Sequence, residues 1–384
     1  MILILGALIA FGPLAIDMYL PAFPVIAVYY DTSPGAVQGT LAAYFIGIAM
    51  GQGVVGPLAD RFGRLPPLLI GTLIFALASL GAAYAPSIEW LVVARYCQAL
   101  GGCAGIVISR AMVRDLFDER QSAQVYSLLM LVMGVAPILA PLFGGFLLAH
   151  FDWPLIFVFQ AIFALVCLVA AWRGLGETLP VQHRLKSSLS TVLYAYLALM
   201  KDRPFVAFTL VNAFMSASMF AYITGVSFIF ISFYNVTPEQ FALIFGGNAA
   251  GYIVAAQINA WLLNHYSGRT IMAVAVGAHL IVATIMLGLN LVTYDMPVLL
   301  AATLFAQMTV SGFIAANAVA AAMSRAQNNA GAAAALNGIV QFGAAGCAGA
   351  LVGLLDNGTP LPMATIIFCF SLAAALSQRA ARSH

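Results

Sequence analysis

The sequence predicts an all-α membrane protein with twelve transmembrane helices in two six-helix halves, and three observations lead to this prediction. Of the 384 residues, 63% are hydrophobic and only 7% are charged, whereas a water-soluble domain carries roughly 25% charged residues. The apolar residues form long continuous runs instead of short alternating segments, which excludes a β-barrel. The length fits twelve spans of about 20 residues with short connections.

The apolar runs, taken in order, define the expected helices. We expect spans at 2–28, 35–58, 66–84, 89–113, 122–148 and 154–173, then at 205–232, 239–264, 270–292, 298–323, 331–354 and 361–378. The first run has no basic leader, so we expect it to be a retained helix and not a signal peptide. These spans give an N-terminal half (1–173), a cytoplasmic linker (174–204) and a C-terminal half (205–384).

Part of the linker is less polar than the rest. The stretch from Ser187 to Lys201 is apolar enough to form an amphipathic helix that lies along the membrane surface.

The charges predict how the chain is oriented in the membrane. Alternate connections contain acids but no Lys or Arg, namely Asp31, Glu89, Asp152, Glu239, Asp295 and Asp356. Every Lys and Arg except Arg95 lies in or beside the other connections or the C-terminal tail. The positive-inside rule therefore places both termini and the linker in the cytoplasm. We expect a monomer in the inner membrane of a bacterium, with the lipid bilayer as its solvent.

Asp17 is the only acid deep within a span, and ionisable groups in hydrocarbon are functional candidates. Pro21 cannot donate a hydrogen bond to the carbonyl of Asp17, and Pro24 similarly frees the carbonyl of Leu20, so the helix is expected to bend beside the carboxyl group. Freed carbonyls at this depth must face protein or a cavity. We interpret Asp17 as a proton carrier. The alternative is a structural carboxylate bonded to neighbouring hydroxyls or to Arg95.

Arg95 lies about six residues into the fourth span, roughly 9 Å from its outer end at 1.5 Å per residue. In one interpretation it pairs with Asp17, holds the outer part of the cavity electropositive, or influences when Asp17 binds a proton. In the other it extends its guanidinium group to the outer interface.

Charged residues also end the second and fourth spans at the cytoplasmic face. Opposite charges there are expected to latch the helix ends when that side is closed, with a generic charged loop as the alternative. The expected cytoplasmic gate comprises Asp60, Arg61, Arg64, Arg110 and Arg114.

The spans of the second half contain no acid or base except His279, which we interpret as structural. Their amides, methionines and aromatic rings suit varied apolar ligands, because such walls adapt and carry few polar anchors. For each of these residues helix packing is the alternative. The expected substrate-binding residues are Tyr19, Tyr44, Gln98, Asn212, Met215, Met219, Phe220 and Asn248. One buried acid favours low proton stoichiometry and neutral or weakly charged cargo.

Other function classes find no support in the sequence. The five cysteines lie in apolar runs without metal-binding spacing, so we expect no metal and no cofactor. No zinc-protease, nucleophile-elbow or nucleotide-binding motif is present, and no basic run suggests nucleic acid. We therefore expect a transporter and not an enzyme. A passive channel is disfavoured by the two halves and the buried acid.

Four motifs resemble a known family. The loop from Gly56 to Arg64 resembles the signature of the major facilitator superfamily, and Arg95 to Gln98 resembles its second signature, with Ala99 where glycine is usual. The stretch from Ala140 to Gly145 resembles the antiporter motif, with Ala140 replacing glycine. Asp17 to Pro24 is similar to the first helix of the bicyclomycin-resistance (Bcr/CflA) drug exporters.

This resemblance implies proton-coupled antiport of small drug-like molecules, such as bicyclomycin, sulfonamides or phenicols. It also implies that Asp17 is the proton-linked acid and Arg95 its partner. The alternative function is proton-coupled transport of an amino acid or another metabolite.

Overall fold

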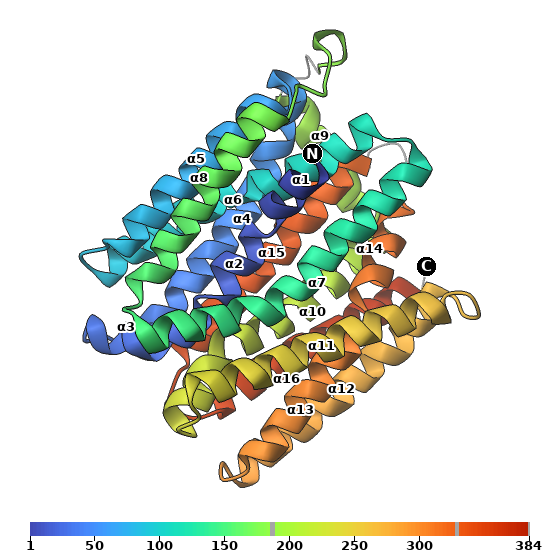
Figure 1. The fold of residues 1–384 in the computed structure, drawn as a ribbon. Coiled ribbons are helices and arrows are strands. Elements are labelled where there is room, and N and C mark those ends of the chain that lie inside the picture. Colours follow the sequence, from blue (N-terminus) through green and yellow to red (C-terminus); the bar gives the residue numbers. More distant parts are fainter. Residues whose placement is uncertain (185–188, 327–329, 383–384) are drawn as a thin grey trace.

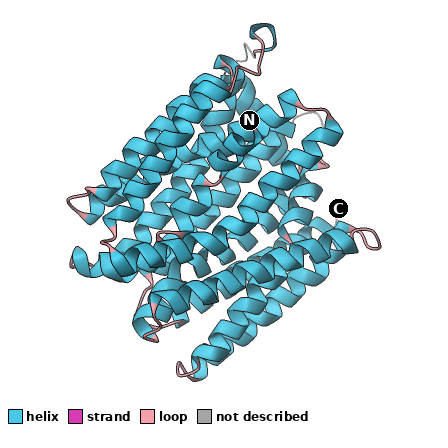
Figure 2. Ribbon diagram, in the orientation of Figure 1, coloured by secondary structure: helices cyan, strands magenta, loops and turns pink. Residues whose placement is uncertain are grey.

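In a computed structural model of the chain, residues 1–184, 189–326 and 330–382 are described. Within these ranges all the regular secondary structure is helical (Figure 2). Twelve helical segments are long and apolar enough to cross a membrane, and each overlaps a span expected from the sequence. The predicted fold class is therefore confirmed.

The first span is broken near its middle, as its prolines predict. It consists of α1 (Ile2–Ile9), α2 (Phe11–Asp17), the 3₁₀ turn η1 (Leu20–Ala22) and α3 (Phe23–Tyr29). The other spans of the first half are α4 (Pro34–Phe62), α5 (Leu65–Ala83), α6 (Ile88–Leu116), α7 (Glu119–His150) and α8 (Pro154–Gly174).

The linker contains the 3₁₀ turn η2 (Val181–His183) and α9 (Leu189–Lys201). The helix expected from Ser187 is present from Leu189, and Ser187 itself lies outside the described residues. The position of α9 along a membrane surface and the boundaries of the linker stay predictions.

The second half has the same number of spans. The seventh joins α10 (Arg203–Ser227) to the π-helix η3 (Phe228–Phe233), and the tenth joins α13 (Pro297–Ser311) to α14 (Ala315–Met323). The others are α11 (Pro238–Leu262), α12 (Gly268–Val292), α15 (Ala330–Leu354) and α16 (Leu361–Arg382).

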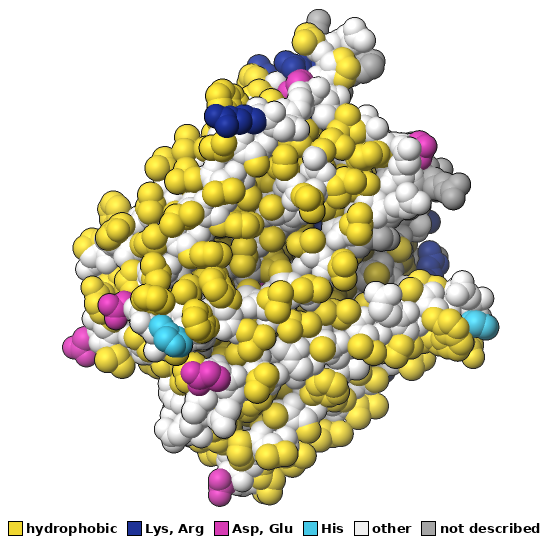
Figure 3. All heavy atoms as spheres, viewed as in Figure 1, with side chains coloured by type: hydrophobic (Ala, Val, Ile, Leu, Met, Phe, Trp, Pro, Cys, Tyr) yellow, Lys and Arg dark blue, Asp and Glu magenta, His cyan; other side chains and the backbone are white. Residues whose placement is uncertain are grey.

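The two ends of the bundle differ in charge. Both termini lie toward the upper right of Figure 1. Lys and Arg side chains gather toward that end on the face shown in Figure 3. At the opposite end of this face the coloured charged side chains are acids and one histidine. We name them the basic end, which holds both termini, and the acidic end, which holds the loops with Asp31, Asp152, Asp295 and Asp356.

The halves share an apolar core that extends to the acidic end. One buried cluster contains residues of both halves, including Phe45 of α4 and Phe220 and Val226 of α10. A second cluster, which includes Phe205 and Met272, draws its buried residues from α9 and the second half alone. The conformation is therefore one in which the halves are packed together at the acidic end.

Candidate functional site

The break in the first span is tied to two other helices through its last carbonyl groups. The final carbonyls of a helix lack intrahelical donors, so they need partners elsewhere. The Arg95 Nη2 group of α6 donates a 2.8 Å hydrogen bond to the Ala15 carbonyl oxygen. Gln160 of α8 donates through Nε2 to the Leu14 carbonyl oxygen at 3.0 Å. Polar side chains in the membrane therefore stabilise α2 where it ends at Asp17.

Arg95 is fully buried, so the interpretation that it extends to an interface is wrong. Its Nη1 group donates to Gln98 Oε1. Its guanidinium carbon lies 4.8 Å from the ring centroid of Tyr19, 4.4 Å from that of Tyr44 and 5.6 Å from that of Phe157. Aromatic faces attract a cation at such distances. The charge of Arg95 is thus surrounded by neutral acceptors and rings.

Gln98 and Gln160 extend this arrangement into a chain of amides. Gln98 Nε2 donates to Ser79 Oγ at 2.7 Å and to Gln160 Oε1 at 2.8 Å. A substrate role for Gln98 stays a prediction, since its amide is engaged within the first half. Gln160 was not among our candidates. The signal that marks it is a single amide side chain in an otherwise apolar span.

The Asp17 side chain is buried, with 5% of its surface exposed. Among the described residues, it makes no hydrogen bond or ion pair. The direct pairing with Arg95, one of the alternatives, is therefore absent, and the Arg95 terminal nitrogens instead bond to Ala15 and Gln98. Tyr44 of the first half and Tyr222 of the second lie within electrostatic range of the carboxyl group. Asp17 thus lies inside the bundle, where its charge affects side chains of both halves.

Aromatic contacts join the halves near this level. Phe220 of α10 lies 4.3 Å from Phe45 of α4 and 6.0 Å from Phe342 of α15, measured between ring centroids. Met219 packs against the shared core, whereas Met215 belongs to the core of the second half. Of these predicted substrate residues, Phe220 is therefore the one whose ring contacts the first half.

The predicted asparagines are both buried and hydrogen-bonded. Asn248 Nδ2 donates to the Tyr222 hydroxyl at 2.7 Å, which links α11 to α10. Asn212 Nδ2 donates to Gln341 Oε1 at 3.2 Å and to Asn337 Oδ1 at 3.4 Å, which links α10 to α15. Tyr222 was not among the candidates, and it is the polar group of the second half that connects Asn248 with the surroundings of Asp17. Binding of cargo by these residues stays a prediction.

A charged cluster at the basic end joins α4, α6 and the linker. Arg64 forms ion pairs with Asp60 and, at 2.8 Å, with Asp115. The Glu177 carboxylate of the linker accepts hydrogen bonds from the backbone N–H groups of Arg64 at 2.8 Å and Leu65 at 3.2 Å. Burial acts to raise the pKa of Glu177, but these backbone donors outweigh it and lower that pKa below its usual value. The linker thereby caps the start of α5.

The other predicted gate residues do not join this cluster. Arg61, Arg110 and Arg114 are exposed, and none forms an ion pair among the described residues. Arg61 lies over the ring of Phe62, with 5.3 Å between its guanidinium carbon and the ring centroid. None of the described ion pairs joins the N-terminal half to the C-terminal half, so the predicted gating role of all five residues stays a prediction.

Comparison with known proteins identifies the family. Residues 3–350 match the family model described as Major Facilitator Superfamily. The chain belongs to this superfamily. Three relatives support the assignment. The transporter YdgK of Bacillus subtilis is 35% identical over 97% of this chain and 93% of its own. The bicyclomycin resistance protein homolog of Haemophilus influenzae is 31% identical over 94% of this chain and 91% of its own.

The third relative, a chloramphenicol resistance protein of Pseudomonas aeruginosa, is 29% identical over 82% of this chain and 71% of its own. The fold is also similar to a solved structure. A bacterial homolog of the lysosomal transporter Spinster, in an inward-facing conformation, superposes with a TM-score of 0.78 at 15% identity, covering 100% of this chain and 96% of that one. The superfamily member described here is therefore a multi-pass inner-membrane transporter and not an enzyme.

Proposed function

We propose that this superfamily member is a proton-coupled antiporter that exports small drug-like molecules by alternating access. Two relatives are named for resistance to bicyclomycin and chloramphenicol, and this supports cargo of that kind. Both termini, and with them the basic end, would lie in the cytoplasm, because the Lys and Arg residues of the connections gather there. The protein would work as a monomer.

One observation carries the proton coupling. Asp17 is buried at a helix break, within electrostatic range of Tyr44 and Tyr222, and no described donor satisfies its carboxyl group. An ionised carboxylate in such a place has nothing to offset its lost hydration, and a bound proton removes that cost. A carboxyl that lies between two moving halves is able to exchange its proton when one side opens.

The packing supports movement of the halves about this level. They share an apolar core toward the acidic end, while the second half has a core of its own that includes Phe205 and Met272. Separation at the acidic end and closure at the basic end would expose Asp17 to the other side. The cluster of Asp60, Arg64 and Asp115 would then form part of the cytoplasmic gate.

The test is transport in everted vesicles with labelled chloramphenicol and an imposed pH gradient. We expect Asp17→Asn to abolish uphill accumulation and drug-dependent proton release, while exchange of drug down its own gradient continues. Asp152→Asn, which removes an exposed acid of the acidic end, is the matched control and should retain both activities. Uphill transport by Asp17→Asn protein would exclude Asp17 from coupling. Competition by amino acids but not by drugs would instead favour the metabolite transporter.

A further inference from the structure

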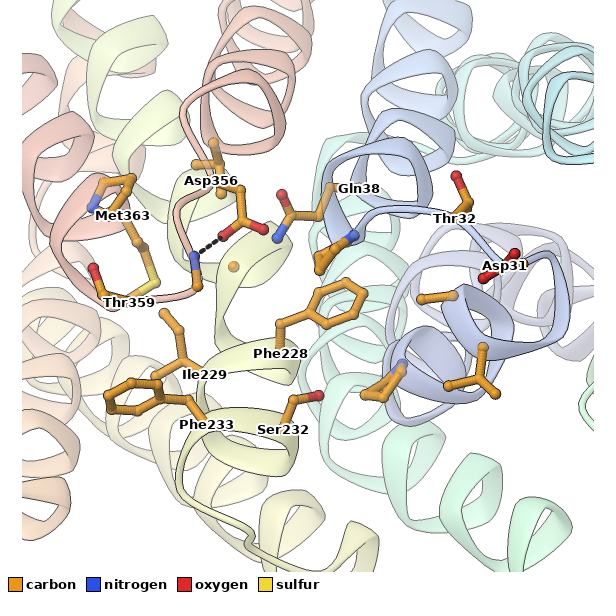
Figure 4. A pocket seen from close by; sticks show the side chains of 18 residues that line it. Asp31, Thr32, Gln38, Phe228, Ile229, Ser232, Phe233, Asp356, Thr359 and Met363 are labelled. Carbon is orange, nitrogen blue, oxygen red and sulfur yellow. Dashed lines mark hydrogen bonds between the residues drawn. The ribbon is translucent and has the colours of Figure 1, made fainter.

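A cavity lies at the acidic end, between the two halves. Its volume is about 530 Å³, within the range of sites for drug-sized ligands. The first half contributes α3 and the start of α4, and the second contributes the junction of α10 with η3 and the loop between α15 and α16 (Figure 4). It is separate from the surroundings of Asp17 and Arg95, which do not line it.

The polar groups of this cavity are suited to a cation. Asp31 and Asp356 line it from opposite halves, and none of the described lining residues is Lys, Arg or His. Gln38 of α4 is 99% buried, yet no donor among the described residues bonds to its Oε1 atom. Figure 4 shows the side chains of Gln38 and Asp356 directed toward one another across the cavity. A buried amide oxygen without a donor next to a carboxylate marks a place where a ligand donor or positive charge is missing.

The remaining wall is apolar and partly aromatic. Phe228, Ile229 and Phe233 come from η3, and Met363 comes from α16. Aromatic faces and carboxylates together bind alkylammonium groups, because the rings attract the cation and the acids neutralise it. A π-helical turn is uncommon and frequently lies at functional sites. We propose that this cavity binds an organic cation, namely a quaternary or protonated amine with an apolar substituent.

Binding would also affect the transport cycle, and this part rests on the proposed function. The cavity exists in the conformation whose halves are packed together at the acidic end, and residues of both halves form its wall. A ligand that binds one conformation preferentially shifts the population toward it. An amine in this cavity would therefore oppose separation of the halves and inhibit export of neutral cargo.

The experiment uses the full chain in detergent and benzyltrimethylammonium as the probe. Its Kd is measured by equilibrium dialysis for the parent protein and for Asp356→Asn, Asp152→Asn and Asp17→Asn proteins. We expect Asp356→Asn to raise the Kd about fivefold, the effect of losing one partly exposed charge pair. The other two variants should leave it unchanged. Neopentylbenzene, which has the same shape without the charge, should not displace the probe at equal concentration.

Two outcomes would overturn the proposal. One is equal binding by the parent and Asp356→Asn proteins. The other is loss of binding in Asp17→Asn protein alone, which would place the cation in the central site. The binding result does not depend on proton coupling, so failure of the proposed function in vesicles and failure of this site are distinguishable.

Discussion

A backbone contact between a glycine of each half gives a sharp test of alternating access. A Cβ atom added to Gly35 of α4 would lie 2.2 Å from the carbonyl oxygen of Gly353 in α15. Ordinary contact begins at 3.4 Å, so Gly35→Ala requires the helices to move apart by about 1 Å. The opposing atom belongs to the backbone, and no rotamer change relieves the overlap. Such overpacking costs about 1–3 kcal/mol.

This cost applies only to the conformation described here, because the two glycines separate when the acidic end opens. Gly35→Ala is therefore expected to raise the ratio of the open form to the closed form by about 5- to 150-fold. Gly39→Ala is the matched control, since it lies one turn further along α4 and a Cβ atom there meets nothing within 4 Å. Both substitutions replace a glycine of α4 with alanine.

The assay is a distance measurement between spin labels on cysteines introduced at Asp152 and Asp295, in a background without native cysteines. These positions lie at the acidic end of different halves. Gly35→Ala should increase the population with the longer distance, whereas Gly39→Ala should match the parent. If the Gly35→Ala and Gly39→Ala proteins give the same distance distribution, contact between these glycines does not hold the acidic end closed.

Three further predictions concern single contacts. Arg95→Lys keeps the charge but loses the planar fork, so we expect a lower thermal melting temperature in detergent and weaker transport; an unchanged melting temperature would contradict this. Glu177→Gln removes the carboxylate charge that accepts a hydrogen bond from the backbone N–H of Arg64. We therefore expect the free energy of unfolding at pH 7 to fall by about 1 kcal/mol. Because the pKa of Glu177 is lowered, its contribution is present at neutral pH and is lost as pH falls through that lowered pKa; the difference between the melting temperatures of the parent and Glu177→Gln proteins should disappear in acid, and a constant difference would refute it. Ser227→Ala removes a 2.6 Å hydrogen bond to the Leu20 carbonyl oxygen in the other half, so it should favour opening of the acidic end in the same spin-label assay, and a shift toward the closed form would refute it.

The spans were predictable because membrane helices are defined by local composition. The bounds of each expected span agree with those of an observed span to within a few residues. The break near Asp17 follows from Pro21 having no N–H group. The junction of α10 with η3 was not predictable in this way. Its sequence, Phe228 to Phe233, is apolar except for Ser232, and its contacts with α3 and α11 are not a local property of the sequence.

The site was predictable only in part, for a similar reason. Asp17 and Arg95 stand out because charge is rare in the membrane. Their relation to each other is not a local property, and the structure shows Arg95 bonded to the Ala15 carbonyl instead of the Asp17 carboxyl. The role of Glu177 was not predictable, since nothing in the linker sequence indicates that it caps α5, which begins more than a hundred residues earlier.

The break in the first span has two consequences that depend on each other. It ends α2 at Asp17, and it leaves the Ala15 carbonyl free to accept a hydrogen bond from Arg95. A continuous helix would supply its own donor to that carbonyl, and the buried guanidinium group would lose an acceptor that offsets its desolvation. The fully buried Arg95 is therefore compatible with this fold because the helix is interrupted there. The same interruption holds an acid, which has no described partner, within electrostatic range of Tyr44 and Tyr222, so the feature that stabilises the cation also creates the candidate proton site.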